Sequence, residues 1–178
     1  MEKRYHHGDL RAALLEVGLR LLAERDVEGV SLREMAREVG VSATSVYRHF
    51  PDKAALMRAL ALEGLDRLAN SQRDAATGKE GAASFAATGR AYVRFALTNP
   101  ALFRLIFTSS AQLQATGEVE ALQMLRVNAA EALPSGLASD EAEASALRAW
   151  SLVHGLAMLM LDGQLPADDH LIEALIKG

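Results

Sequence analysis

Apolar residues recur at helical spacing along almost the whole chain. Near the start, Leu10, Leu14, Val17 and Leu21 are three or four positions apart, so they share one face of a helix. Runs in which β-branched residues alternate with polar ones, the pattern of a half-buried strand, are missing. The sequence therefore predicts an all-α fold.

Three short helices are predicted within residues 9–50. Ser31 and Glu34 have the spacing of a capping box at the start of the second helix, and Ser42 is a candidate N-cap for the third. The residues expected to begin and end the three helices are Asp9 and Asp26, Ser31 and Gly40, and Ser42 and Pro51.

A longer fourth helix, four further helical segments and a last short helix are predicted in the remainder of the chain, which brings the total to about nine. They are expected over 52–74, 82–98, 100–107, 117–133, 139–161 and 167–176, with a loop over 75–81.

The composition fits a globular protein with a sizeable core. Half of the 178 residues are hydrophobic (50%) and 24% are charged, which excludes a disordered or collagen-like chain. The sequence contains no cysteine, so disulfides, thiolate zinc sites and cysteine nucleophiles are excluded. This composition agrees with a reducing cytosol.

Charge is divided unevenly along the chain. Residues 1–53 contain nine Lys and Arg against nine Asp and Glu, so the net charge of −4 comes from residues 54–178. No stretch of 18 uncharged apolar residues occurs, and residues 1–9 lack the hydrophobic core of a signal peptide. We therefore expect a cytoplasmic protein without a membrane-spanning helix.

Two predicted helices flank the turn Gly40-Val41-Ser42, which matches the arrangement of a helix-turn-helix. Ala36 is small where the helices approach each other, and Val46 can fill the angle between them. In a helix-turn-helix the second helix enters the major groove of DNA. The spacing alone leaves DNA binding open, because helix, turn and helix also recur in all-α proteins that bind no DNA.

The amino-acid sequence of this segment resembles the DNA-binding region of TetR-family transcriptional regulators. Residues 30–56 read VSLREMAREVGVSATSVYRHFPDKAAL. They match the family pattern at Gly40, Val41, Ser42, Tyr47, His49, Phe50, Lys53 and Leu56. The C-terminal part is similar to the domain type named for its Trp-His-Gly motif, here Trp150, His154 and Gly155.

The resemblance implies a homodimeric repressor built from two domains. Residues 1–53 would form the helix-turn-helix DNA-binding domain, and residues 54–178 a helical domain for effector binding and dimerisation. Members of the family typically lose operator affinity when a small molecule occupies the C-terminal domain. The expected partners are therefore a pseudo-palindromic double-stranded operator, a small-molecule effector and a second copy of the chain, with no membrane and no cofactor.

Polar side chains of the second and third helices are the candidates for contact with DNA. Tyr47 offers a planar ring and a hydroxyl group, and it is either a DNA contact or a half-buried packing residue. Ser42 either donates to a phosphate or only caps its helix, and Lys53 either binds a phosphate or is solvated. The candidates are Ser31, Arg33, Ser42, Ala43, Thr44, Tyr47, Arg48, His49 and Lys53.

Aromatic side chains, a methionine and a histidine are the candidates for an effector pocket, although most of them can equally be core residues. They are Tyr92, Phe95, Phe103, Phe107, Met124, Trp150 and His154. His154 lies on an apolar helix, where a satisfied core or interface histidine is more frequent than a catalytic base. Arg94, Arg104 and Arg126 are candidates for orienting an anionic ligand if one of them points inward, but arginines on a helix surface are more common.

Residues 150–161 have apolar side chains on nearly every face of the helix. A small monomer covers only one face of such a helix, so part of this apolar surface is left over. We expect this segment and the last helix to pack against a second subunit in a four-helix arrangement. The interface candidates are Trp150, His154, Gly155, Met158, Leu171 and Leu175.

No pattern in the sequence predicts an enzyme or a metal site. A Ser/His/Asp order, a glycine-rich phosphate loop and a paired ligand motif are all missing. The adjacent His6 and His7 do not readily converge on one ion. A helical interaction module without DNA binding is the remaining alternative to a regulator.

Overall fold

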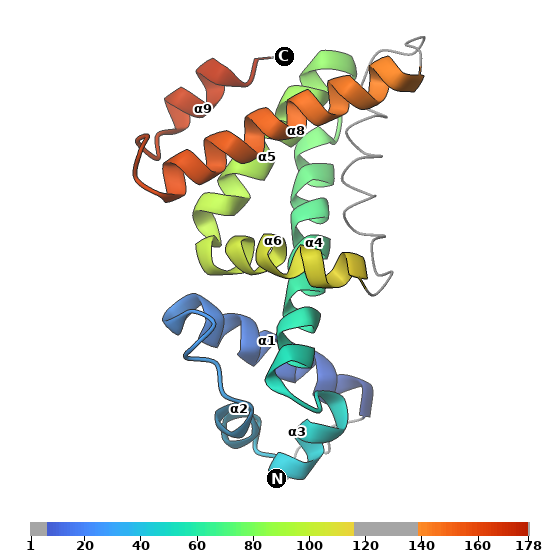
Figure 1. Cartoon of the computed structure of the whole chain (residues 1–178), viewed down its shortest axis with the longest axis vertical. Coiled ribbons are helices and arrows are strands. Elements are labelled where there is room, and N and C mark those ends of the chain that lie inside the picture. Colours follow the sequence, from blue (N-terminus) through green and yellow to red (C-terminus); the bar gives the residue numbers. More distant parts are fainter. Residues whose placement is uncertain (1–6, 116–138, 178) are drawn as a thin grey trace. The chain divides into compact units, whose positions relative to one another are not determined.

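The computed structural model describes residues 7–115 and 139–177, and the regular secondary structure in these ranges is helical throughout (Figure 1). The helices of the described part are α1 (His7–Arg25), α2 (Leu32–Val39), α3 (Ala43–His49), α4 (Lys53–Ala76), α5 (Gly81–Thr98), α6 (Pro100–Ala115), α8 (Ser139–Leu161) and α9 (Asp169–Leu175). The all-α prediction is confirmed. The predicted helix over 117–133 and the candidates Met124 and Arg126 lie outside the described residues.

Several helix ends differ from the predictions by one or two residues, and one differs by more. The helix α4 ends at Ala76 and not at 74, which shortens the predicted loop over 75–81, and α9 covers Asp169–Leu175 and not 167–176. The helix α1 begins at His7, so Asp9 lies inside it and is not its N-cap; helix ends shift by a residue or two when no side chain is needed to fix them. The helix α6 continues to Ala115, beyond the predicted end at 107, because neither glycine nor proline follows Phe107 until Gly117.

The chain divides into two compact units, and each is described by itself. The first consists of Met1–Gly64 and Ala101–Ala111, and the second of Leu65–Pro100 and Gln112–Gly178. The helix α4 runs without interruption from the first unit into the second.

The first unit has a core of leucine, methionine and aromatic side chains. Within it, α2 packs on both α1 and α3. The side chains with less than 3% of their surface exposed include Leu14, Leu21, Leu22, Met35, Val46, Phe50, Leu56, Leu60, Phe103 and Ile106. Burying one such side chain contributes about 1.5–3 kcal/mol, so these residues fix how the short helices are oriented.

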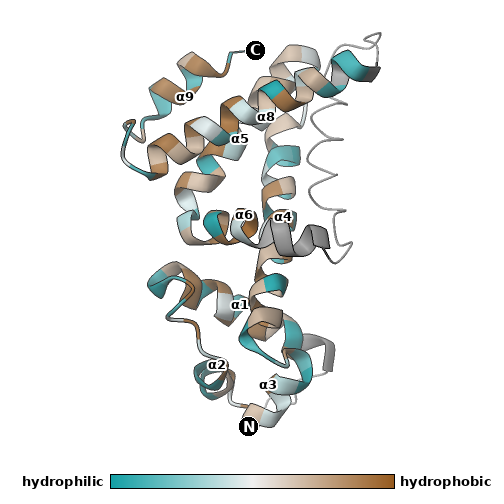
Figure 2. Ribbon diagram, in the orientation of Figure 1, coloured by the Kyte–Doolittle hydropathy of each residue, from teal (hydrophilic) through white to brown (hydrophobic). Residues whose placement is uncertain are grey.

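The second unit is built around α5, which packs against α8 and α9. Tyr92, Val93 and Ala96 of α5 are buried together with Ala157 of α8 and Ile172 of α9. In Figure 2 most of α8 is tan to brown, the colours of apolar residues.

Much of this apolar surface of α8 is not covered by the described part of the chain. Leu147, Leu152 and Leu159 are 50%, 51% and 40% exposed. By length and composition alone, Glu143–Leu161 also qualifies as a membrane span, with 22% of that window buried. The sequence-based expectation considered only uncharged stretches, and this segment contains Glu143 and Arg148. One such helix is a weak indication of a membrane protein, since helices that pack on protein pass the same test.

Candidate nucleic-acid interface

Gly40 forms the predicted turn between α2 and α3. Its φ of 78° and ψ of 32° lie in the left-handed region, which favours glycine. Its N–H donates to the carbonyls of Ala36 and Arg37, and the N–H of Val41 donates to the carbonyl of Ala36 at 2.9 Å. These bonds close the end of α2 in a Schellman motif. The backbone conformation is therefore the reason that a glycine stands here.

The helix α3 is fixed by a cap at its start and by apolar side chains on its inner face. The Ser42 hydroxyl oxygen accepts a hydrogen bond from the N–H of Ser45 at 3.1 Å, so Ser42 caps α3 as predicted. Val46 is fully buried and Phe50 is 2% exposed. The guanidinium group of Arg11 lies 5.7 Å from the centre of the Phe50 ring, which adds a cation–π contact from α1.

The outer face of α3 is left in solvent. Ala43, Thr44 and Arg48 are exposed, and Tyr47 is 42% exposed. Tyr47 is thus a surface residue. Together these side chains present a hydroxyl, a phenol and a guanidinium group, which are suited to hydrogen bonds with phosphates and base edges.

The start of α2 adds Ser31 and Arg33, which are both exposed. The predicted capping box is wrong, because the Ser31 side chain makes no capping hydrogen bond. Glu34 instead accepts two hydrogen bonds from Nη1 of Arg25, at 2.8 and 3.0 Å. The carboxylate is therefore used to join α2 to the end of α1, and the Ser31 hydroxyl does not cap the helix.

His49 and Lys53 differ from the other DNA candidates because both are half-buried. The His49 ring lies 6.5 Å from the Phe50 ring, centre to centre. The Lys53 ammonium group donates a hydrogen bond to the backbone carbonyl of Glu28 at 3.1 Å. Lys53 thus has a partner within the chain. The two alternatives from the sequence were a bound phosphate and a solvated side chain, and neither included this partner.

The structure brings the DNA candidates together on one unit. The exposed members, all on α2, α3 or the residues that cap them, are Ser31, Arg33, Ser42, Ala43, Thr44, Tyr47 and Arg48. In a helix-turn-helix the second helix is the one that enters the major groove, and α3 is the second helix of this motif.

Three of the effector-pocket candidates form a hydrogen-bonded cluster in the second unit. The indole N–H of Trp150 donates to the Tyr92 hydroxyl oxygen at 3.3 Å, and that oxygen lies 2.9 Å from Nδ1 of His154. Because the Tyr92 oxygen accepts from Trp150, the arrangement suits donation of its proton to a neutral His154. Burial lowers the pKa of His154 and raises the pKa of Tyr92, and both shifts favour these uncharged forms.

The remaining described pocket candidates are not all in the same unit as this cluster. Phe95 is buried in α5 of the second unit. Phe103 and Phe107 lie on α6 in the first unit, with their ring centres 4.8 Å apart.

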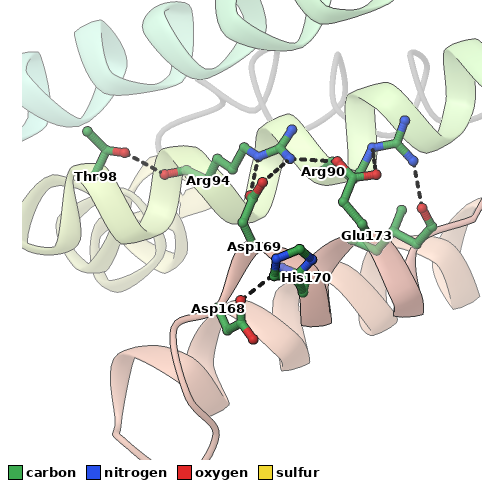
Figure 3. Close-up of polar contacts among 8 residues, drawn as sticks. Arg90, Arg94, Thr98, Asp168, Asp169, His170 and Glu173 are labelled. Atoms are coloured by element: carbon green, nitrogen blue, oxygen red, sulfur yellow. Dashed lines mark hydrogen bonds and ion pairs between the residues drawn. The ribbon is translucent and has the colours of Figure 1, made fainter.

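Arg94 contacts protein carboxylates on α9 (Figure 3). It donates to both carboxylate oxygens of Asp169, at 2.7 and 2.9 Å, and to Glu173 at 2.6 Å. Arg90 lies beside it, with Nε 3.3 Å from the same Glu173 and Nη1 donating to the carbonyl of Ile176 at 2.7 Å. These two arginines therefore tie α9 to α5, and Arg94 is not placed to orient an anionic ligand.

The interface candidates have different surroundings within the chain. Trp150 and His154 are half-buried and bonded to Tyr92, whereas Leu175 is 46% exposed. A Cβ added at Gly155 would meet no atom within 4 Å, so nothing in the described part of the chain approaches it closely. Met158 and Leu171 are half-buried. The exposed Leu147, Leu152 and Leu159 were not among the predicted interface residues. The one signal in the sequence is that they lie at helical spacing from Gly155 and so share its face of α8.

Two family models match the chain. The one described as "Bacterial regulatory proteins, tetR family" matches residues 14–60. The one described as "Tetracyclin repressor-like, C-terminal domain" matches residues 85–177, more than half of the chain. The second match contains the Trp150, His154 and Gly155 motif and is compatible with the Trp-His-Gly subtype, which stays a prediction.

Individual relatives are also transcriptional regulators. The uncharacterized HTH-type transcriptional regulator YobS of Bacillus subtilis is 24% identical over 163 residues, which cover 91% of this chain and 84% of YobS. The tetracycline repressor protein class D of Escherichia coli is 35% identical over 57 residues, which cover 32% of this chain and 26% of that protein.

A solved structure is similar over nearly the whole length. It is a protein of unknown function from Rhodococcus sp. RHA1, 34% identical, with a TM-score of 0.78, and the match covers 97% of this chain and 94% of that one. The two family models, the similarity to YobS and the helix-turn-helix geometry all indicate the same family. The chain therefore belongs to the TetR family of bacterial DNA-binding transcriptional regulators, and it is not an enzyme.

Proposed function

We propose that the chain is a ligand-responsive repressor that binds a pseudo-palindromic operator through α3. The observation that carries the proposal is the exposed polar face of α3, with Thr44, Tyr47 and Arg48, on a helix anchored by the buried Val46. Tyr47 contacts a base edge or a phosphate, and Arg48 a phosphate. Ser31 and Arg33 add backbone contacts from the start of α2. Binding to DNA places the protein in the cytoplasm.

The operator would be bound by two copies of the chain. Residues 1–53 would form the DNA-binding domain, called the reader below, and residues 54–178 would serve dimerisation and effector binding. The apolar surface of α8 and the exposed Leu175 of α9 support this assignment, because residues 7–115 and 139–177 leave them in water. Two α3 helices in successive major grooves are about 34 Å apart. Gly155 is the point at which the two α8 helices approach each other closely.

The effector would bind beside the cluster of Tyr92, Trp150 and His154. The cluster places polar groups among the apolar side chains of the second unit, the combination that fixes the orientation of a ligand. Trp150 is the single tryptophan of the chain, so its fluorescence reports on this site. A compound that changes Trp150 emission should also release DNA; a compound that saturates this signal without affecting DNA binding would contradict the assignment.

Substitution of Tyr47 tests the DNA-binding surface. The probe is a duplex selected from a random-sequence library by the wild-type protein. We expect Tyr47→Ala to weaken the complex about tenfold to a hundredfold in a gel-shift titration, since a base contact contributes about 1–3 kcal/mol. The thermal midpoint should stay close to wild type because the side chain is exposed.

The Tyr47→Phe variant is the matched control, because it keeps the ring and removes only the hydroxyl group. A loss shared by both variants assigns the contact to the hydroxyl, and a loss in Tyr47→Ala alone assigns it to the ring. If the wild-type protein selects no duplex, or if Tyr47→Ala binds as tightly as wild type, the proposed reader is wrong.

A further inference from the structure

The helix α2 carries arginines and glutamates in a regular order. Arg33 and Arg37 are four positions apart, as are Glu34 and Glu38, so each pair shares one face of the helix. Neighbouring positions are turned by about 100° around the helix axis, so the two faces point in different directions. The charges of these four residues cancel, and like charges at this spacing repel each other. The sequence of α2 alone therefore gives no excess of positive charge.

The glutamates of α2 are paired with arginines of α1. Nη1 of Arg25 donates to both carboxylate oxygens of Glu34, at 2.8 and 3.0 Å. Arg20 donates to Glu38 and also, within α1, to Glu24 at 3.0 Å. Each carboxylate of α2 thus has a cation of another helix as its partner, on the side of α2 where α1 packs.

The arginines of α2 are not paired in this way. Arg33 and Arg37 are both exposed, and no ion pair or side-chain hydrogen bond joins either of them to another residue within 7–115 or 139–177. Arg33 lies near Ser31 at the start of α2, and Arg37 lies three residues before Gly40, where the chain turns into α3. The two guanidinium groups therefore form a positive row from the DNA candidates at the start of α2 to the turn that leads to those of α3.

We propose that Arg33 and Arg37 form a phosphate-binding row along α2, with Arg37 as a DNA contact that was not among the candidates from the sequence. Arg20 and Arg25 are positioning residues: by pairing with the glutamates of α2 they hold those carboxylates away from the row. A guanidinium group matches two oxygens of one phosphate, and each phosphate bound releases about one counterion. This inference rests on the proposed function, since it extends the surface that contacts the operator.

The first test measures how DNA binding depends on salt in the full-length protein, using the selected duplex. In Arg37→Met we expect about fivefold weaker binding at about 0.15 M salt. The slope of log affinity against log salt should decrease by about one, the effect of one lost phosphate contact. The thermal midpoint should stay at the wild-type value, because the side chain is exposed. The control Lys79→Met removes a cation outside the reader and should leave the slope unchanged.

The second test asks whether the pairs with α1 keep the row free. Arg20→Met leaves the carboxylate of Glu38 without its cation, so we expect binding about twofold to fivefold weaker, the range for an exposed charge. When Glu38→Gln is added to Arg20→Met, that carboxylate is gone as well, and affinity should return to about the wild-type value. If Arg20 only held α2 in place, the double variant would bind as weakly as Arg20→Met.

Three results would overturn the inference and leave the proposed function standing. They are an unchanged salt slope in Arg37→Met, which would show a solvated arginine, wild-type affinity in Arg20→Met, and no recovery in the double variant. Failure of the wild-type protein to select any duplex would overturn the proposed function itself.

Discussion

Gly40 shows how a single backbone conformation shapes the reader. An added Cβ would meet no atom within 4 Å, so the only obstacle to a side chain is the φ of 78°. We expect Gly40→Ala to lower the free energy of unfolding by about 1–2 kcal/mol, because L-residues other than Asn and Asp avoid this region. Gly40→Asn should cost less. Urea denaturation measures both, and equal losses would show that something other than φ determines the effect.

We expect His154 to make the stability of the protein depend on pH. Burial lowers its pKa below the ordinary value of 6.5, so below that pH the unfolded chain takes up a proton that the folded chain resists. Stability should therefore fall as the pH is lowered through 6.5 and level off below the pKa of the folded protein. In His154→Asn, whose amide oxygen can still accept from Tyr92, this component should be missing. Thermal midpoints measured between about pH 5 and pH 8 test the difference; parallel curves would contradict it.

At the scale of helices, the attachment of α9 depends on charge. The hydrogen bonds from Arg94 lower the pKa of Asp169 and raise the pKa of Arg94 itself. Both side chains are well exposed, at 43% and 65%, so salt screens the pair. We expect Arg94→Met to speed amide exchange in α9 about twofold to fivefold, with no change in α1.

High salt provides the control for that prediction. It should produce a similar increase in the wild-type protein and a smaller one in the variant, where the pair of Arg90 and Glu173 remains. Equal salt sensitivity of α9 in both proteins would show that charges other than Arg94 are responsible for it.

At the scale of the whole molecule, the exposed leucines of α8 support a dimer. Leu152 is 51% exposed, so Leu152→Asp should fold but should not bury its carboxylate between two subunits. We expect light scattering to give a dimer mass for wild type and a monomer mass for the variant. Operator affinity should fall at least tenfold, because one reader alone loses the second half-site.

Tyr47→Asp is the matched control. It places the same charge on an exposed large hydrophobic residue, but in the described ranges this residue lies outside α8 and α9. It should keep the dimer mass and lose DNA binding through repulsion of the phosphates. A monomeric wild-type protein, or an unchanged mass for Leu152→Asp, would contradict the proposed interface.

The helices and the reader were predictable because their signals are local. Helical spacing, Gly40 as a helix stop and Ser42 as a cap depend on residues within a few positions of each other, and the family pattern lies within residues 30–56. The errors occurred where a distant partner competes with a local one. Glu34 pairs with Arg25, nine positions away, and the Ser31 side chain makes no capping bond; the pair of guanidinium and carboxylate is a charge-assisted bond that competes with the local cap.

The sequence by itself determined the fold class, the helix-turn-helix and the membership of the family, because a few local residues specify each of them. Only the tertiary structure decided which polar groups meet. Tyr92 is 58 positions from Trp150 and 62 from His154, Arg94 is 75 from Asp169, and Lys53 is 25 from the Glu28 carbonyl. Such pairs depend on how helices pack, and helix packing is set by the buried side chains of several elements together.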